Sequence, residues 1–260
     1  MFHFSFTRIN DTARRVADKL PCALKKLFDI VHEDADLLVI NKPAGLVCHP
    51  TKGDEYSSLI SRARLHVGAG AEPQLINRLD RETSGVTVLA KNAQTALEIR
   101  RIWERRDVVK KYLTIVHGAV DTGEGLIDAP LGKDTRSPVA IKDCVTPEGA
   151  PAQTQFRVLR RFRRAEGEFS VLEVQPLTGR KHQIRIHLAH MGHAIVGDKL
   201  YGPDENIYLD FVNYRLTDEQ RQRLILPHHA LHAGEVRFEW RGEERQFCAE
   251  AEQWFSEFIG

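Results

Sequence analysis

Short runs of apolar residues dominate the chain and predict more strands than helices. Asp36–Lys42 and Tyr112–Val116 are rich in β-branched and apolar residues, as expected of buried or half-buried strands. Thr154–Leu159 and Phe169–Gln175 alternate well enough between apolar and polar side chains to predict an antiparallel pair. Leu231–Trp240 predicts a last strand.

Helices are fewer, and their starts are marked by capping residues. Asn92 is a good N-cap for a helix whose apolar residues recur at helical spacing up to Trp103. Thr217 with Gln220 forms the pattern of a capping box, and Ala249–Ile259 predicts a C-terminal helix. Because strands outnumber helices and hairpins join most of them, the pattern favours an α+β fold over a doubly wound α/β fold.

Length and composition set limits on domains and compartment. The chain has 260 residues, of which 42% are hydrophobic, enough for a sizeable core. Residues 1–30 are too short for a domain and are interpreted as an N-terminal arm or extension. The four cysteines are far apart with no CxxC pair, which is typical of a reducing compartment. With no membrane-spanning run and no signal pattern, we expect a cytoplasmic protein that does not interact with membranes.

The formal net charge is only +1, so overall charge does not indicate a nucleic-acid partner. Basic residues are nevertheless concentrated in Arg100–Lys111 and Arg157–Arg164. Such clusters can follow phosphates, or they can simply form a solvated face. Both interpretations remain open for these segments.

The segment Ile76–Lys91 combines a turn, a strand and a charged cluster. Asp80 lies between Arg78 and Arg81, and Thr83-Ser84-Gly85 leads into a β-branched-rich strand. Nearby positive charge keeps a carboxylate ionised, which makes Asp80 a candidate nucleophile or electrostatic stabiliser. The alternative is an aspartate that accepts backbone hydrogen bonds in a turn.

The sequence around Asp80, RLDRETSG, resembles the catalytic loop of the RluA-type pseudouridine synthases. Further blocks resemble the same family in the same order: Leu37–Pro50, Lys110–Gly118, Leu177–Gly202 and Ala230–Phe238. The resemblance implies that residues 31–260 form the catalytic domain. It also implies a mixed, mostly antiparallel sheet with flanking helices and a catalytic cleft across the sheet. One departure is Asn77, where family members often carry histidine. Some relatives begin with a small S4-type RNA-binding domain, for which residues 1–30 leave no room.

The resemblance also assigns roles to individual side chains. It implies that Asp80 is catalytic, that Tyr112 stacks on the base and helps to remove a proton, and that Arg180 pairs with Asp80. It points to Arg78 as the side chain that fills the gap left by a flipped uridine. The alternatives are a core tyrosine for Tyr112 and phosphate-binding roles for the two arginines. Gln183, with its neighbour Arg185, could reach a base edge or the RNA backbone, so Gln183 is a candidate substrate-binding residue.

The implied reaction suits these residues. Isomerising uridine to pseudouridine requires the N1–C1′ bond to break and C5 to join C1′, and a carboxylate can meet the positive charge that develops on the ribose. The reaction needs no cofactor, and the chain carries no GxGxxG, P-loop or nucleophile elbow. We therefore expect an RNA pseudouridine synthase acting on tRNA or rRNA, monomeric and without an obligatory protein partner.

Two other classes remain open. One is a catalytically inactive RNA-binding protein on the same fold, which the presence of Asp80, Tyr112 and Arg180 disfavours. The other is a metal-dependent hydrolase, because several histidines cluster at His182, His187, His190 and His193. The cluster contains no HExxH and no cysteine, so we expect no metal site.

Overall fold

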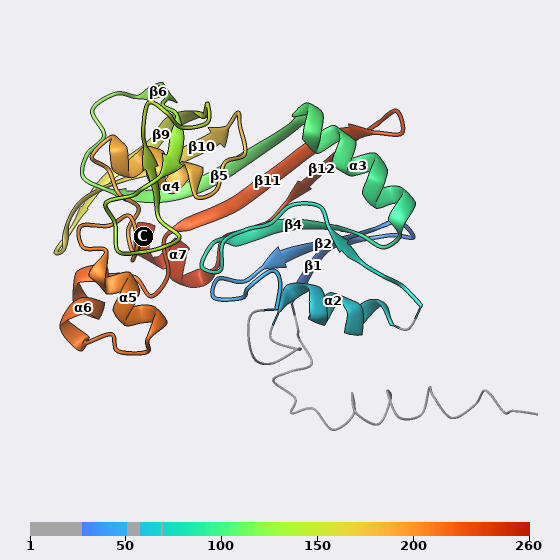
Figure 1. The fold of residues 1–260 in the computed structure, drawn as a ribbon, viewed down its shortest axis with the longest axis horizontal. Helices are drawn as coiled ribbons and strands as arrows, with labels where there is room; N and C mark the ends of the chain where they lie inside the picture. The colour runs from blue at the N-terminus through green and yellow to red at the C-terminus, as the bar shows by residue number, and fades with distance from the viewer. Residues whose placement is uncertain (1–27, 51–57, 69) are drawn as a thin grey trace, which may run out of the picture.

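The computed structural model describes residues 28–50, 58–68 and 70–260 (Figure 1). Most of the predicted N-terminal arm, residues 1–30, therefore lies outside the described residues. The first strand, β1, covers Asp29–Glu33. The remaining elements that build the sheet are β2 (Leu37–Lys42), β3 (Gln74–Leu75), β4 (Ser84–Ala90), β5 (Val108–His117), β6 (Glu124–Asp128), β9 (Gln153–Arg164), β10 (Gly167–Pro176), β11 (Leu231–Trp240) and β12 (Glu243–Cys248).

These strands form one ten-stranded sheet in the order β1-β2-β4-β11-β5-β10-β9-β6. Two further strands pair off this path, β12 with β11 and β3 with β4. The pairing of β4 with β11 is parallel, whereas the other pairs in the sheet are antiparallel. The predicted α+β fold with a mixed, mostly antiparallel sheet is confirmed. A separate small sheet joins β7 (Leu131–Lys133) to β8 (Asp143–Val145).

Helices flank the sheet at both ends of the molecule. In Figure 1, α3 lies at one end, whereas α4, α5 and α6 lie at the other. The helices are α2 (Leu59–Val67), α3 (Ala93–Arg105), α4 (Gln183–His190), α5 (Asn206–Val212), α6 (Asp218–Leu224) and α7 (Gln253–Ile259). Among the described residues, no helix is long and apolar enough to cross a membrane.

Local sequence signals account for several of these boundaries. The Asn92 side chain accepts a hydrogen bond from the backbone N–H of Thr95 and so caps α3, as predicted; such a cap contributes about 1 kcal/mol. Thr217 and Gln220 form the predicted capping box of α6. The C-terminal helix α7 is shorter than predicted, because it begins at Gln253 and not at Ala249.

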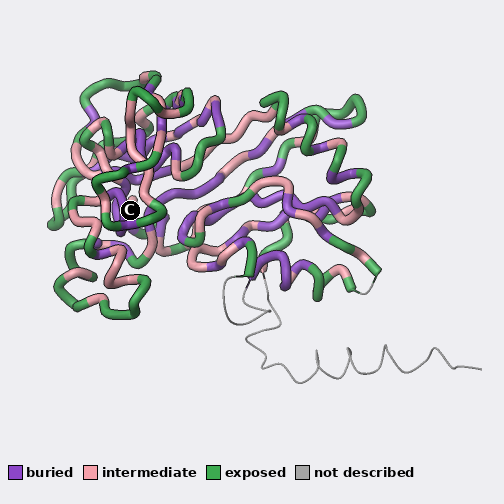
Figure 2. Tube along the Cα trace, viewed as in Figure 1, coloured by how far each residue is buried: buried purple, intermediate pink, exposed green. Residues whose placement is uncertain are grey.

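The hydrophobic core lies on both sides of the central strands, and most of β4 and β11 is buried in Figure 2. All residues of β4 are buried. At the end of the sheet nearer α4, Ile184 and Leu188 pack in the same cluster as Phe156 and Val174 of β9 and β10. This packing fixes α4 against the sheet, because removing such side chains from water is the main favourable contribution to folding.

One row of the sheet register brings the central residues together. Lys42 of β2 pairs with Gly85 of β4, and Gly85 pairs with Ala233 of β11. Ala233 in turn pairs with Tyr112 of β5, which pairs with Val174 of β10. The loop that carries Asp80 enters β4 directly beside this row, so the candidate site lies at the middle of the sheet.

Gly85 is required where β4 meets β11. Its φ is +113°, and a Cβ atom there would lie 2.3 Å from the carbonyl oxygen of Ala233. A side chain would therefore push the two strands apart. Gly85 thus allows the close parallel contact between β4 and β11, which keeps the end of the Asp80 loop near β11.

Candidate active site

The Asp80 loop is held in place by contacts along its whole length. The backbone carbonyl of Arg81 accepts hydrogen bonds from the Gly45 N–H at 2.8 Å and from the Lys42 ammonium at 3.1 Å. Further along, the Thr83 hydroxyl lies 2.7 Å from Nε2 of His229, and the Ser84 hydroxyl lies 2.9 Å from Nδ1 of His232. These contacts fix the backbone on both sides of Asp80.

Lys42 is the most unusual of these supports, because its side chain is fully buried. Its ammonium donates to the carbonyl oxygens of Pro43, Leu46 and Arg81, which fills all three donor positions. Burial lowers the pKa of Lys42 to about 8, although nearby acidic groups oppose this shift. Lys42 therefore links the turn after β2 to the Asp80 loop.

The Asp80 carboxylate is bound by Arg185 of α4. Nη1 of Arg185 lies 2.8 Å from Oδ2 of Asp80. The same guanidinium makes two bonds to Asp198, from Nε to Oδ2 at 2.7 Å and from Nη2 to Oδ1 at 2.9 Å. One arginine thus bridges two carboxylates, using the fork geometry that a lysine lacks.

Burial differs across this bridge. The side chain of Asp198 is 0% exposed and that of Arg185 is 7% exposed, whereas the Asp80 side chain is 30% exposed. Asp198 also accepts the backbone N–H groups of Leu200 and Tyr201. Asp198 and Arg185 therefore form a rigid buried support, and Asp80 carries the negative charge that solvent or a substrate can reach.

The electrostatics of the site keep Asp80 ionised. Burial alone would raise the pKa of Asp80, but the positive charge of Arg185 and its hydrogen bond to the carboxylate lower it below its usual range. The predicted ionised state agrees with this direction, but the responsible charge is Arg185. Arg81 instead donates to the carbonyl of Gly45 and lies over the ring of Phe211.

Tyr112 lies where the sheet register places it, near Asp80. Burial, and then the negative charge of Asp80, raise the pKa of Tyr112 well above its usual value. The side chain is therefore a neutral phenol at physiological pH. It can donate a hydrogen bond, but it does not supply a preformed phenolate base.

The predicted ion pair between Arg180 and Asp80 is wrong for this structure. Arg180 is exposed, and its Nε donates to the carbonyl of Pro151 at 3.1 Å. Arg180 lies in the loop before α4, whereas Arg185 is the third residue of the helix, on the side that faces the Asp80 loop. A charged residue between Ile184 and Ile186 was the available signal, because a charge within an apolar helical run must find a buried partner.

The predicted substrate-binding role of Gln183 is also not supported by its contacts. The side chain is 4% exposed. Its oxygen accepts from the Thr178 hydroxyl and the Arg180 N–H, and its nitrogen donates to the Gln153 carbonyl and the Thr154 hydroxyl. Because all four hydrogen-bonding positions of the amide are occupied, Gln183 fixes the loop before α4 to β9.

Arg78, by contrast, is exposed and forms no hydrogen bond or ion pair with the described residues. The Asn77 side chain is turned to β4: its amide nitrogen donates to the Val86 carbonyl, and its amide oxygen accepts from the Val88 N–H. Asn77 thus ties the start of the Asp80 loop to β4 and leaves Arg78 projecting beside it.

The histidines of the 182–193 segment form hydrogen bonds with different partners. Both ring nitrogens of His187 are used, by the Thr154 hydroxyl and the Ala129 carbonyl. His193 contacts the His117 carbonyl, and His182 contacts Tyr201. Within the described ranges, no group of three or more histidine, cysteine, aspartate or glutamate residues is arranged to hold a metal ion.

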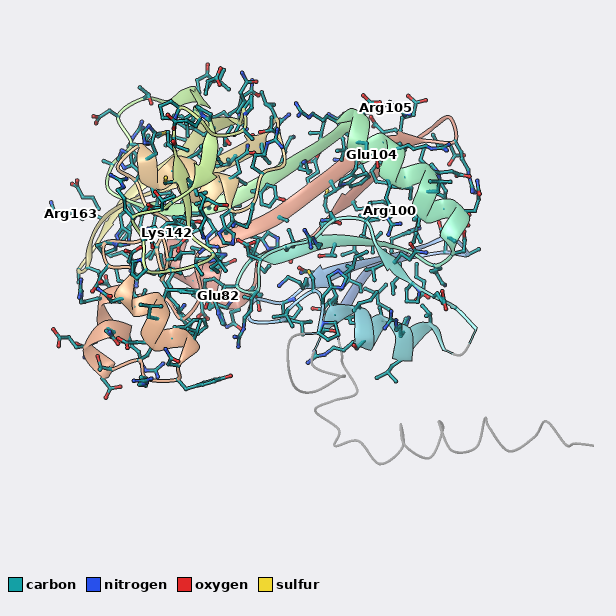
Figure 3. The ribbon with its side chains drawn as sticks, in the orientation of Figure 1. Glu82, Arg100, Glu104, Arg105, Lys142 and Arg163 are labelled. Atoms are coloured by element: carbon teal, nitrogen blue, oxygen red, sulfur yellow. The ribbon has the colours of Figure 1, made fainter. Side chains whose placement is uncertain are left out.

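The basic clusters are also partly explained by local contacts. In the β9–β10 hairpin, Arg157 pairs with Glu173, Arg161 donates to the Val120 carbonyl, and Arg164 donates to the Phe258 carbonyl. Figure 3 shows Arg163 at one end of the molecule and Arg100 and Arg105 of α3 towards the other. The two clusters therefore do not form one continuous basic surface.

Comparison with known proteins identifies the family. A sequence model described as RNA pseudouridylate synthase matches residues 36–190. The ribosomal large subunit pseudouridine synthase D of Vibrio cholerae is 34% identical over 249 residues, covering 93% of this chain and 71% of the relative. The chain belongs to the RNA pseudouridylate synthase family. Its relatives and motifs are of the RluA type, as the sequence predicted.

Other relatives extend the comparison. An uncharacterized RNA pseudouridine synthase of Bacillus subtilis is 36% identical over 69% of this chain. The chain spans 59% of that relative's length, and 51% of a similar protein from Chloroflexus aurantiacus. The solved structure of human RNA pseudouridylate synthase domain containing 4 matches with a TM-score of 0.70 at 28% identity, covering 96% of this chain and 97% of the human chain.

Proposed function

We propose that this chain is an RNA pseudouridine synthase in which Asp80 acts on the target uridine. The observation that carries the proposal is the state of the Asp80 carboxylate. It is ionised and partly exposed at the middle of the sheet, and Arg185 holds one of its two oxygens. Such a group is suited to nucleophilic or electrostatic catalysis at C1′.

The reaction conserves atoms. The N1–C1′ bond breaks, the base turns, and C5 forms a bond to C1′; the proton on C5 is then lost and N1 gains one. Asp80 can serve this sequence by attacking C1′, by adding to C6 of the base, or by removing a ribose proton. Tyr112, a neutral phenol near Asp80, packs against the base. Its hydroxyl oxygen takes the C5 proton as its own O–H proton passes to water, and water returns a proton to N1.

Arg78 is the side chain that gives the enzyme access to the target uridine. A base within a folded RNA must leave its stack before C1′ and C5 become accessible. Arg78 is exposed, lies two residues before Asp80 and has no partner among the described residues, so its planar guanidinium is available to occupy the gap. Arg78→Ala should reduce turnover of a folded RNA far more than that of a short unstructured strand. Equal losses on both substrates, with a shallower salt dependence of binding, would indicate a phosphate contact instead.

Ribosomal and transfer RNA are the substrates to test, and large-subunit ribosomal RNA comes first. The support is the 34% identity over 93% of this chain to the Vibrio cholerae enzyme, whose name specifies the ribosomal large subunit. An inactive RNA-binding protein on this fold is disfavoured, because the chain has an ionised Asp80, bound by Arg185, with Tyr112 nearby.

The experiment compares pseudouridine maps of total RNA from cells with and without this chain. Cells lacking it should lose one or more pseudouridines, and the wild-type chain should restore them. Asp80→Asn, which removes the charge but keeps the shape, should restore none. Asp121→Asn, the same change at an exposed position, is the matched control and should restore all. Restoration by Asp80→Asn would contradict the proposed role of Asp80.

A further inference from the structure

The two oxygens of Asp80 have different surroundings. Oδ2 accepts the 2.8 Å hydrogen bond from Arg185. Oδ1 faces Nε2 of His182 at 3.8 Å, which is beyond hydrogen-bonding range. Because Arg185 occupies Oδ2, Oδ1 is the oxygen available for reaction, and His182 is the side chain beside it.

His182 is held in an unfavourable backbone conformation to reach this position. It is the N-cap residue of α4 with φ of 54° and ψ of 17°, in the left-handed region. Residues with a Cβ seldom adopt this conformation, and those that do cluster at functional sites. The side chain makes no capping hydrogen bond and is only 10% exposed. Helix capping therefore does not explain why a histidine occupies the position.

The hydrogen bonds of Tyr201 determine which nitrogen of His182 carries the proton. The Tyr201 hydroxyl lies 2.8 Å from Nδ1 of His182, and it also accepts a weak bond from the Asp143 N–H at 3.4 Å. No other acceptor for this hydroxyl exists among the described residues, so the hydroxyl proton is donated to Nδ1. Neutral imidazole then carries its proton on Nε2, the nitrogen facing Asp80.

Two other features favour this neutral form and hold its partner in place. Burial lowers the pKa of His182, and the positive charges of Arg185 and Lys181 act in the same direction; Asp80 and Asp198 oppose them. The guanidinium of Arg185 lies over the Tyr201 ring, 5.0 Å from its centroid. Tyr201 is therefore fixed by the same arginine that holds Asp80.

We propose that His182 is a positioning residue whose Nε2–H, held in this tautomer by Tyr201, donates to Oδ1 of Asp80 and aims that oxygen at the target ribose. This inference rests on the proposed function of Asp80. The bond forms when RNA binding closes the 3.8 Å gap to about 3 Å, because catalytic hydrogen bonds often tighten only in the substrate complex. Its loss should slow the single-turnover rate by roughly 10- to 100-fold, the usual effect of losing a hydrogen bond to a charged group.

Two substitutions separate this role from a purely structural one. His182→Gln keeps an N–H near the position of Nε2 but loses the acceptor for Tyr201. His182→Asn keeps an acceptor near the position of Nδ1 and suits the left-handed backbone, but it has no donor that reaches Asp80. A positioning role predicts that the single-turnover rate of His182→Gln stays within a few-fold of wild type and that His182→Asn is slow. A structural role predicts the reverse order.

The test measures single-turnover rates at saturating RNA, with RNA affinity and thermal unfolding recorded for each variant. The His182→Asn variant should react slowly, although it is folded and binds RNA with unchanged affinity. An Asn variant as fast as wild type, or a Gln variant slower than Asn, would overturn the inference. Nitrogen NMR of labelled histidine provides a second readout: Nε2 should be protonated in wild type, and a proton on Nδ1 would also overturn it. If wild type forms no pseudouridine in any RNA, it is the proposed function that fails.

Discussion

The loop before α4 and the helix itself carry similar side chains in opposite circumstances. In the loop, Arg180 is exposed and bonds to a backbone carbonyl, and Lys181 is 49% exposed in its ion pair with Asp143. In the helix, Arg185 is 7% exposed and bonds to two carboxylates. The two arginines lie in one sequence block, yet only the one inside the helix is placed to control Asp80.

The difference shows what gives a charged side chain a defined role. A buried guanidinium must satisfy its charge and its donors within the protein, because an unpaired buried charge costs several kcal/mol. Its geometry is therefore fixed by its partners. An exposed arginine is solvated and remains free to move, so it contributes little to stability. Partners and burial, rather than closeness to a motif, separate Arg185 from Arg180.

The largest effect should follow from removing the buried guanidinium. Arg185→Met leaves Asp80 and Asp198 without their shared partner, and breaking a buried pair in this way costs about 3–5 kcal/mol of unfolding free energy. Pseudouridine formation, corrected for the folded fraction, should fall about 100-fold or more, as when an oriented electrostatic contact is lost. Denaturant unfolding and single-turnover assays measure the two effects. A variant of wild-type stability and rate would show that the bridge is dispensable.

The contrast between Arg180 and Arg185 also shows which parts of this site the sequence predicts. Asp80 and the adjoining strand are predictable, because the turn residues, charges and strand pattern are all local in the sequence. The partner of Asp80 is not, because it depends on the orientation of α4, which is set by tertiary packing. The sequence indicates Arg185 only as a possible RNA contact. The Asp198 support and the three carbonyl acceptors of Lys42 likewise arise only when distant segments meet.

The fold shows a similar division. The strand pair β9–β10, the cap of α3 and the capping box of α6 follow from alternation and from single polar residues, so they are predictable. The parallel contact between β4 and β11 joins residues far apart in the chain, and only Gly85, with a φ of +113°, records it locally. Helix α5 has no side-chain cap, so the sequence offered no start signal for it.

A smaller effect, on stability alone, is expected at Gln183. Gln183→Ala removes one hydrogen bond each from the Thr178 and Thr154 hydroxyls, the Arg180 N–H and the Gln153 carbonyl. Each is a loss of about 1–3 kcal/mol where water does not replace the amide. RNA affinity should stay at the wild-type value. Gln155→Ala, an exposed position on the adjoining strand, is the matched control and should change neither. A Gln183 variant of normal stability that binds RNA weakly would restore the substrate-binding hypothesis.

The smallest effect concerns pH. In the folded chain the pKa values of Asp80 and Asp198 are lowered; burial raises both, but Arg185 outweighs it. In the unfolded chain an aspartate titrates near about pH 3.9. Both carboxylates therefore stabilise the fold above about pH 4, and this contribution is lost as the pH falls below that value. Unfolding free energies measured from about pH 6 to about pH 3 should decline, and less steeply in Asp198→Asn. An identical slope in the variant would contradict this account.

The most direct test of the central claim replaces each arginine by lysine and keeps the charge at both positions. A lysine at 185 cannot bridge two carboxylates, so Arg185→Lys should slow single-turnover pseudouridine formation at saturating RNA by about tenfold or more. The rate of Arg180→Lys should match that of wild type within about twofold, since the substitution keeps the positive charge at an exposed position. A fast Arg185→Lys variant together with a slow Arg180→Lys variant would contradict the account. It would show that the exposed Arg180, and not Arg185, controls the Asp80 carboxylate.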